Sequence, residues 1–304
     1  MCEHGRGVVR SAPRLEPIER IVGVLAGDEI EIPAHVRIIT LRAMTDKLRL
    51  GGMALANGVL VHGPTSWACA IRTDDGELKV AAERKRLIGN RVRNPLLRGP
   101  ARILESFAVL PRVKLVLPEA RLPFERPRVL ASMVGSAIVL QRVRRSRLRP
   151  AAQELTAGLL SLAPALLALR GGSLAAYHGA EHISIGTYEH GEDRPKEHER
   201  CGSHLVGPLL ASTAAGNVLA SRAPAHLRGP ARAVAAVGAV AAATEIFGWM
   251  QRNPEHPLAH ALAEPGHQLQ HRIATADPTP EQLEVAEAAL RACLDLEERG
   301  DAHA

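Results

Sequence analysis

The fold is decided by the stretch GGMALANGVLVHGP, residues 51–64, and by the segment that follows it. Glycines and a proline separate short apolar runs there, which is typical of strands joined by tight turns. Residues 67–72 and 77–82 then flank Thr73-Asp74-Asp75-Gly76, and Asp-Gly at the centre of such a segment indicates a hairpin turn. A small β unit is therefore expected near the N-terminus.

Beyond Arg84 the apolar residues recur at helical spacing. The closing helix begins at Thr279-Pro280-Glu281-Gln282, which combines an N-cap, a proline at the first helical position and a capping-box glutamine. We expect this helix to be a packing element. The other expected helices cover 97–110, 129–140, 155–169 and 234–249, with a weaker one at 205–220.

These patterns predict a mainly helical α+β protein, a small β unit followed by a helical bundle with several apolar helices. The expected division is a flexible lead-in over 1–32, a β-rich unit over 33–84 that begins with a strand at 35–41, and a helical metal-site bundle over 85–304 closed by the C-terminal helix.

The apolar helices have two readings that the residues leave open. None reaches the roughly 18–20 uninterrupted apolar residues of a transmembrane helix, so they could be buried core helices. However, the basic run Arg142-Val-Arg-Arg-Ser-Arg-Leu-Arg149 lies between the first two long apolar stretches. A basic turn between apolar helices is typical of a membrane hairpin with a cytoplasmic turn.

Composition narrows the class of protein. The net charge of +6 would suit an anionic partner, but aromatic residues make up only 2% of the chain. Without aromatic side chains to stack on bases, nucleic-acid binding is not expected. The first twenty residues contain three glutamates and no apolar run, so no cleavable signal peptide is expected. The four cysteines are far apart, which favours free thiols.

Residues 178–204 gather the side chains that bind metals. Five of the 14 histidines lie in this window together with Cys201 and several glutamates. On a helix His178 and His182 are four residues apart, so both imidazoles can reach one cation. With Glu181 they form the pattern H-x-x-E-H, in which two histidines hold zinc and the glutamate is the general base. His198 and Cys201 could complete a tetrahedral site.

Two alternatives stay open for this cluster. The first is a structural hydrogen-bonded network without a metal. The second is a bound divalent cation, for which zinc is the first choice because the ligands are nitrogen and sulfur. The role of that cation depends on its coordination. If Cys201 takes the last coordination position the metal is structural, whereas an open position would allow water activation.

The segments YHGAEH at 177–182 and HERCGS at 198–203, preceded by residues 51–64 and followed by PGHQLQ at 265–270, resemble the motifs of the DUF1385 family, also described as YqhQ-like predicted metal-dependent enzymes. The motif order is kept over most of the chain. The resemblance implies a metal-dependent enzyme at the cytoplasmic membrane, hydrolytic if a water position is open. A non-catalytic membrane scaffold or assembly factor with a structural metal is the alternative.

Carried over residue by residue, the resemblance implies Glu181 as the catalytic base. The implied metal ligands are His178, His182, His198 and Cys201, and Glu245 inside the last apolar stretch is a further candidate ligand. The family's Glu and Gln in the glycine-rich segment are Asn57 and Met53 here, which would weaken activity if those side chains act. Motif positions without an expected role are Gly51, Gly52, Asn57, Gly58, Arg200, Gly202 and Gln270.

Overall fold

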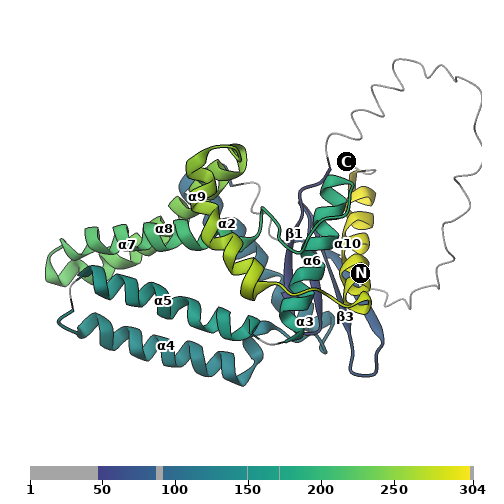
Figure 1. Cartoon of the computed structure of the whole chain (residues 1–304), viewed down its shortest axis with the longest axis horizontal. Helices are drawn as coiled ribbons and strands as arrows, with labels where there is room; N and C mark the ends of the chain where they lie inside the picture. The colour runs from purple at the N-terminus through teal and green to yellow at the C-terminus, as the bar shows by residue number, and fades with distance from the viewer. Residues whose placement is uncertain (1–46, 87–91, 149, 171, 302–304) are drawn as a thin grey trace, which may run out of the picture.

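The computed structural model describes residues 47–86, 92–148, 150–170 and 172–301 (Figure 1). The expected lead-in over 1–32 and the expected strand over 35–41 lie outside these residues. Within them the mainly helical α+β class is confirmed, because one small antiparallel sheet is followed by long helices.

The sheet has four antiparallel strands in the order β1-β2-β3-β4. The strands are β1 Gly51–Leu55, β2 Gly58–His62, β3 Ser66–Arg72 and β4 Leu78–Arg84. The predicted hairpin is confirmed. Its turn places Gly76 at φ 80°, a left-handed conformation that favours glycine, and the Gly76 N–H donates to the Thr73 carbonyl over 3.0 Å.

Both faces of the sheet are covered by helices. Helix α6 (Ser173–His190) and helix α10 (Pro280–Asp301) pack on one face, where Val59, Val61 and Ala70 meet Tyr177 and Val285. On the other face, Trp67 and Ile71 contact α3 (Leu110–Val116). The C-terminal helix begins at Pro280, as its capping pattern predicts, and packs on the sheet as expected.

Helix α6 connects the two expected parts, and their division into a β-rich unit over 33–84 and a metal-site bundle over 85–304 stays a prediction. This helix carries His178 and His182, yet it packs directly on β1 and β2. The physical reason is that its buried face, including Ala180 and Ile185, shares one core with the sheet. The sheet therefore positions the candidate site.

Four long helices extend away from the sheet as a separate arm (Figure 1). They pair as α4 with α5 and α7 with α8, and we call them the apolar arm. Their bounds are Pro127–Arg145 for α4, Pro150–Leu169 for α5, Val206–Ser221 for α7 and Arg228–Arg252 for α8. Helices α2 (Pro95–Ala108) and α9 (Pro257–Leu269) pack against α8.

One predicted helix is divided. The periodic segment 97–110 ends at Ala108, and α3 starts at Leu110 with Pro111 in its first turn. Proline has no N–H to donate to the preceding turn, so it is tolerated at a helix start and interrupts a continuous helix.

Large hydrophobic side chains of the apolar arm face outward. Val234 of α8, Leu219 of α7 and Leu159 of α5 are 74%, 63% and 61% exposed. The segment Ala225–Arg252 is long and apolar enough to cross a membrane, with a mean hydropathy of 1.6, and only 22% of that window is buried. Helices α5 and α6 pass the same test together as a pair bent by 89°.

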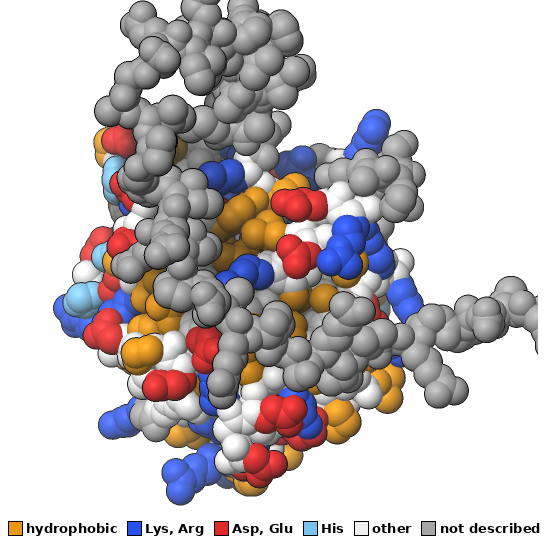
Figure 2. All heavy atoms as spheres, turned by 90° about the vertical axis from the view of Figure 1, so that its right-hand side faces the viewer, with side chains coloured by type: hydrophobic (Ala, Val, Ile, Leu, Met, Phe, Trp, Pro, Cys, Tyr) orange, Lys and Arg blue, Asp and Glu red, His pale blue; other side chains and the backbone are white. Residues whose placement is uncertain are grey.

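The surface at the α10 end of the molecule is different. It carries Lys, Arg, Asp and Glu side chains intermixed with hydrophobic ones (Figure 2). In contrast, Glu154 is the only acidic residue in 127–170 and 206–244, which make up most of the arm. Over these residues the arm is therefore largely apolar, and all of its charged residues except Glu154 are basic.

Candidate metal site

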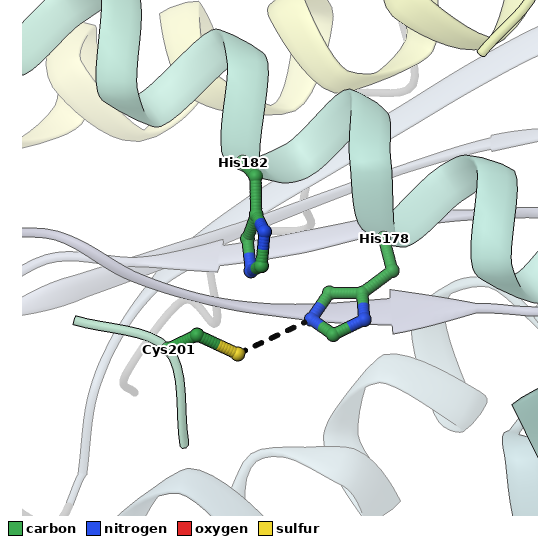
Figure 3. Close-up of side chains that lie close together, drawn as sticks. All are labelled: His178, His182 and Cys201. Atoms are coloured by element: carbon green, nitrogen blue, oxygen red, sulfur yellow. Dashed lines mark hydrogen bonds between the residues drawn. The ribbon is translucent and has the colours of Figure 1, made fainter. Parts of the chain in front are cut away.

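The two histidines of the H-x-x-E-H pattern project from α6 toward Cys201 (Figure 3). The helix ends at Gly191, whose φ of 77° provides the left-handed C-cap conformation. One helical turn separates the two imidazoles, and their ring centroids lie 4.3 Å apart. The spacing therefore produces the predicted pair.

Backbone carbonyls fix the orientation of both rings. The Nδ1 atom of His178 lies 2.8 Å from the Ala274 oxygen, and that of His182 lies 2.6 Å from the Lys196 oxygen. Because a carbonyl can only accept, each Nδ1 carries a proton, so the neutral form of each ring has its lone pair on Nε2. Histidine ligands of metals are oriented by such second hydrogen bonds.

The third member of the group is Cys201. Its Sγ lies 3.6 Å from His178 Nε2, and one ligand atom from each of His178, His182 and Cys201 lies within 4.8 Å of the other two. Burial raises the pKa of the Cys201 thiol, and burial together with neighbouring imidazoles lowers the pKa of His182 to about 2. His182 is thus neutral at pH 7, as a metal ligand must be.

Gln270 holds the loop that carries Cys201. Its side-chain oxygen accepts from the His198 N–H over 2.8 Å, and its Nε2 donates to the Ser203 hydroxyl over 2.8 Å and to the His198 carbonyl over 3.2 Å. The side chain is fully buried and belongs to the π-helical turn Gln270–Ala274. The motif position without an expected role is therefore a positioning residue for the cysteine loop.

Glu181 is buried beside the group and faces β1. One of its oxygens lies 3.9 Å from His178 Nε2, and burial raises the pKa of its carboxyl to about 7. A Cβ atom on Gly52 would lie 2.2 Å from Glu181 Oε1. The glycine-rich segment therefore makes room for the carboxylate.

His198 lies next to the group rather than in it. Its Nδ1 accepts from the Arg200 N–H over 3.2 Å, so the proton is on Nε2, which is buried without a hydrogen bond and 3.3 Å from Glu189. Arg200 forms an ion pair with the same Glu189. Within the described residues, the set that could share one ion is His178, His182 and Cys201.

The remaining candidate site residues make structural contacts elsewhere in the fold. Glu245 accepts from Arg98 Nε over 2.6 Å on the α2–α8 contact, so it is not brought to the group. Asn57 joins the β1–β2 turn to the next segment by accepting from the Arg121 N–H over 2.9 Å and donating to the Arg72 carbonyl over 3.2 Å. Gly58 is close to the Ala70 carbonyl, where a Cβ atom would lie 2.1 Å away. These two contacts are structural.

A cavity of about 430 Å³ opens onto the ligand group. Its polar half contains His178, Glu181, His182 and Cys201, with Gly202 and Arg200 at the loop. Apolar side chains of α5 and α6 form much of the remaining lining, which we call the apolar half. The edge strand contributes Gly51, Gly52 and Met53, so the motif residue that replaces the family's Gln lines this cavity.

His62 also lines the cavity, and the sequence did not single it out. It pairs with Gly51 in the sheet register, and a Cβ atom on Gly51 would lie 2.6 Å from its ring. Burial and Lys85 lower the pKa of His62 to about 4, while Glu105 opposes this effect. Ser106 Oγ lies 3.4 Å from Nε2 of the His62 ring.

The neutral burial of His62 predicts a pH dependence of stability. The unfolded chain takes up this proton below about pH 6.5 and the folded chain only below about pH 4. As the pH falls through this window the free energy of unfolding should therefore decrease, by at most ~3 kcal/mol for this group. Thermal unfolding of the metal-free protein between these pH values should show a smaller decrease in His62→Gln than in the wild type. Equal decreases would contradict the assignment.

The donor set fits zinc. Imidazole nitrogen and thiolate sulfur bind zinc at about 2.1 and 2.3 Å, so small side-chain movements suffice to bring these three atoms onto one ion. The two fixed tautomers present unprotonated nitrogens, which is the state that coordination requires.

The comparisons with known proteins agree with the motif resemblance. Residues 173–296 match the family model described as "Protein of unknown function (DUF1385)". The matched segment begins at α6 and includes the cysteine loop and Gln270. No significant match is found among curated proteins or among solved structures. Residues 173–296 are therefore similar to the DUF1385 family, whose function is unknown.

Proposed function

We propose that this protein is a zinc-dependent hydrolase that associates with the cytoplasmic membrane through its apolar arm. The observation that carries the proposal is the set of three protein ligands, His178, His182 and Cys201, beside a cavity. Catalytic zinc sites typically have three protein ligands and one open position, whereas structural sites have four. Because His198 is engaged by Arg200 and faces Glu189, we expect the fourth coordination position to be open to water.

A bound zinc ion would supply Lewis-acid polarisation and would lower the pKa of a water molecule toward neutrality. The protein supplies the base and the positioning. Glu181 lies in the same cavity wall, so its carboxylate can take the proton of the attacking water and give it to the leaving group. The water oxygen bonds to the carbonyl carbon or the phosphorus as the bond to the leaving group breaks.

Membrane association is supported by the arm. Several of its hydrophobic side chains, including Val234, Leu219 and Leu159, are more than half exposed, and exposed apolar surfaces of this kind mark interaction sites. The ends of α4 and α7 lie at the same tip of the arm (Figure 1). Arg142, Arg144 and Arg145 are in the last turn of α4, Arg222 caps α7 and Arg228 begins α8, which suits anionic lipid headgroups.

Glu181→Gln tests the catalytic role. The variant should keep zinc, because Glu181 is not one of the three ligands, and should lose about 100-fold or more in kcat because a general base is removed. The assay is zinc-dependent hydrolysis of a panel of nitrophenyl acyl and phosphate esters by the full chain. Glu192→Gln, an exposed acid after the same helix, is the matched control.

Two results would contradict the proposal. Full activity in Glu181→Gln would remove the proposed base. A zinc-loaded wild type that hydrolyses no substrate class would favour the scaffold, in which the metal only stabilises the fold. For the membrane part, recovery of the full chain in the soluble fraction without detergent would count against the arm as an anchor.

A further inference from the structure

The cavity at the ligand group has an apolar half that the proposed chemistry does not use. Ala165, Ala168 and Leu169 of α5 line it together with Leu174 and Ile185 of α6. Water and a scissile bond need only the polar half, where His178, Glu181 and His182 lie. The apolar half thus provides space for a hydrophobic part of a ligand.

Helix α5 joins this wall to the surface of the apolar arm. Ala168 is buried in the cavity wall, whereas Leu167 is 40% exposed on the outer side of the same helix turn. Ala165 lines the cavity and is itself exposed, so it lies at the mouth. The apolar half of the cavity is therefore continuous with the hydrophobic surface that would contact lipid.

We propose that the substrate is a membrane amphiphile, with its scissile ester or amide at the histidine–cysteine group and its acyl or alkyl chain along α5. This inference rests on the proposed function and names the substrate class of the same site. A soluble polar substrate would leave the apolar half filled with poorly hydrogen-bonded water, whereas a chain from the bilayer can enter along α5 without crossing an aqueous gap. The basic tip of the arm suits the anionic headgroups among which such a lipid resides.

The test uses hydroxamates, whose head binds zinc and whose chain length can be varied. Binding of acetohydroxamate, butanohydroxamate, hexanohydroxamate and octanohydroxamate to the zinc-loaded full chain is measured by calorimetry. Each added methylene group that enters the apolar half should tighten binding about fourfold. Ala165→Trp fills the mouth and should flatten this dependence while acetohydroxamate still binds. Leu159→Trp, an exposed change on the same helix outside the cavity, should leave it intact.

The outcomes separate the two proposals. Binding of acetohydroxamate without a gain for longer chains overturns the amphiphile substrate and leaves the zinc site standing. A gain that persists unchanged in Ala165→Trp also overturns it, because the chain then binds elsewhere. Absence of binding by all four hydroxamates to protein that retains zinc would mean that no coordination position is open, and would overturn the proposed function together with this inference.

Discussion

Replacing His182 by alanine should lower the affinity for zinc by more than ~100-fold. Loss of a group that only hydrogen-bonds a metal ligand lowers the affinity by up to about 100-fold, and loss of the ligand itself should cost more. The imidazole is one of three side chains in the group, and its Nδ1 is already held by the Lys196 carbonyl. The ring is therefore already oriented for zinc binding, and alanine removes this oriented nitrogen atom. The measurement is a competition titration of the full chain with a zinc chelator.

His190→Ala is the matched control. This residue lies on the same helix, but its ring bonds the Gly186 carbonyl over 3.0 Å and faces Glu199, outside the group. Because His182 is 3% exposed, alanine also leaves a void, so the thermal unfolding of metal-free wild type and variant is compared as well. A zinc affinity of His182→Ala within about threefold of the control would be incompatible with the site.

Gly52→Val should destabilise the fold by about 1–3 kcal/mol, the usual cost of forcing extra atoms into a packed region. A Cβ atom there would lie 2.2 Å from Glu181 Oε1 and 2.6 Å from its Cγ, and the Glu181 side chain is buried where α6 packs on β1. The clash would push α6 away from the sheet, so zinc affinity should decrease together with the unfolding temperature.

Gly202→Ala serves as the control for Gly52→Val, because a Cβ atom on Gly202 meets nothing within 4 Å although the residue lines the same cavity. The double variant Gly52→Val with Glu181→Ala removes the clashing side chain and should recover much of the lost stability. If the effects of the two substitutions on the free energy of unfolding were additive instead, the clash with Glu181 would not be the cause of the destabilisation.

The parts of the fold that depend on local chemistry could be predicted from sequence. The Asp75-Gly76 turn requires a glycine with positive φ, and this requirement reveals the β3–β4 hairpin. The pairing of His178 with His182 follows from helical geometry alone. Gln270 appeared only as a motif position, since its bonds to His198 and Ser203 join segments about 70 residues apart.

The rest depends on tertiary partners that no local pattern encodes. The resemblance makes Glu245 a candidate metal ligand, but Arg98, 147 residues away in sequence, pairs with it. His62 reaches the cavity only because strand register places it opposite Gly51. The packing partner of α6 also could not be predicted, because its buried side could equally have faced a helical bundle instead of the sheet.

The central claim is one zinc ion held by His178, His182 and Cys201 with one open position. X-ray absorption at the zinc edge of the zinc-loaded full chain tests it most directly, because sulfur and nitrogen or oxygen ligands differ in distance by about 0.2–0.3 Å. We expect one sulfur and three nitrogen or oxygen ligands, and loss of the sulfur signal in Cys201→Ser. A zinc shell without sulfur in the wild type, or a wild-type protein that binds no zinc, would contradict it.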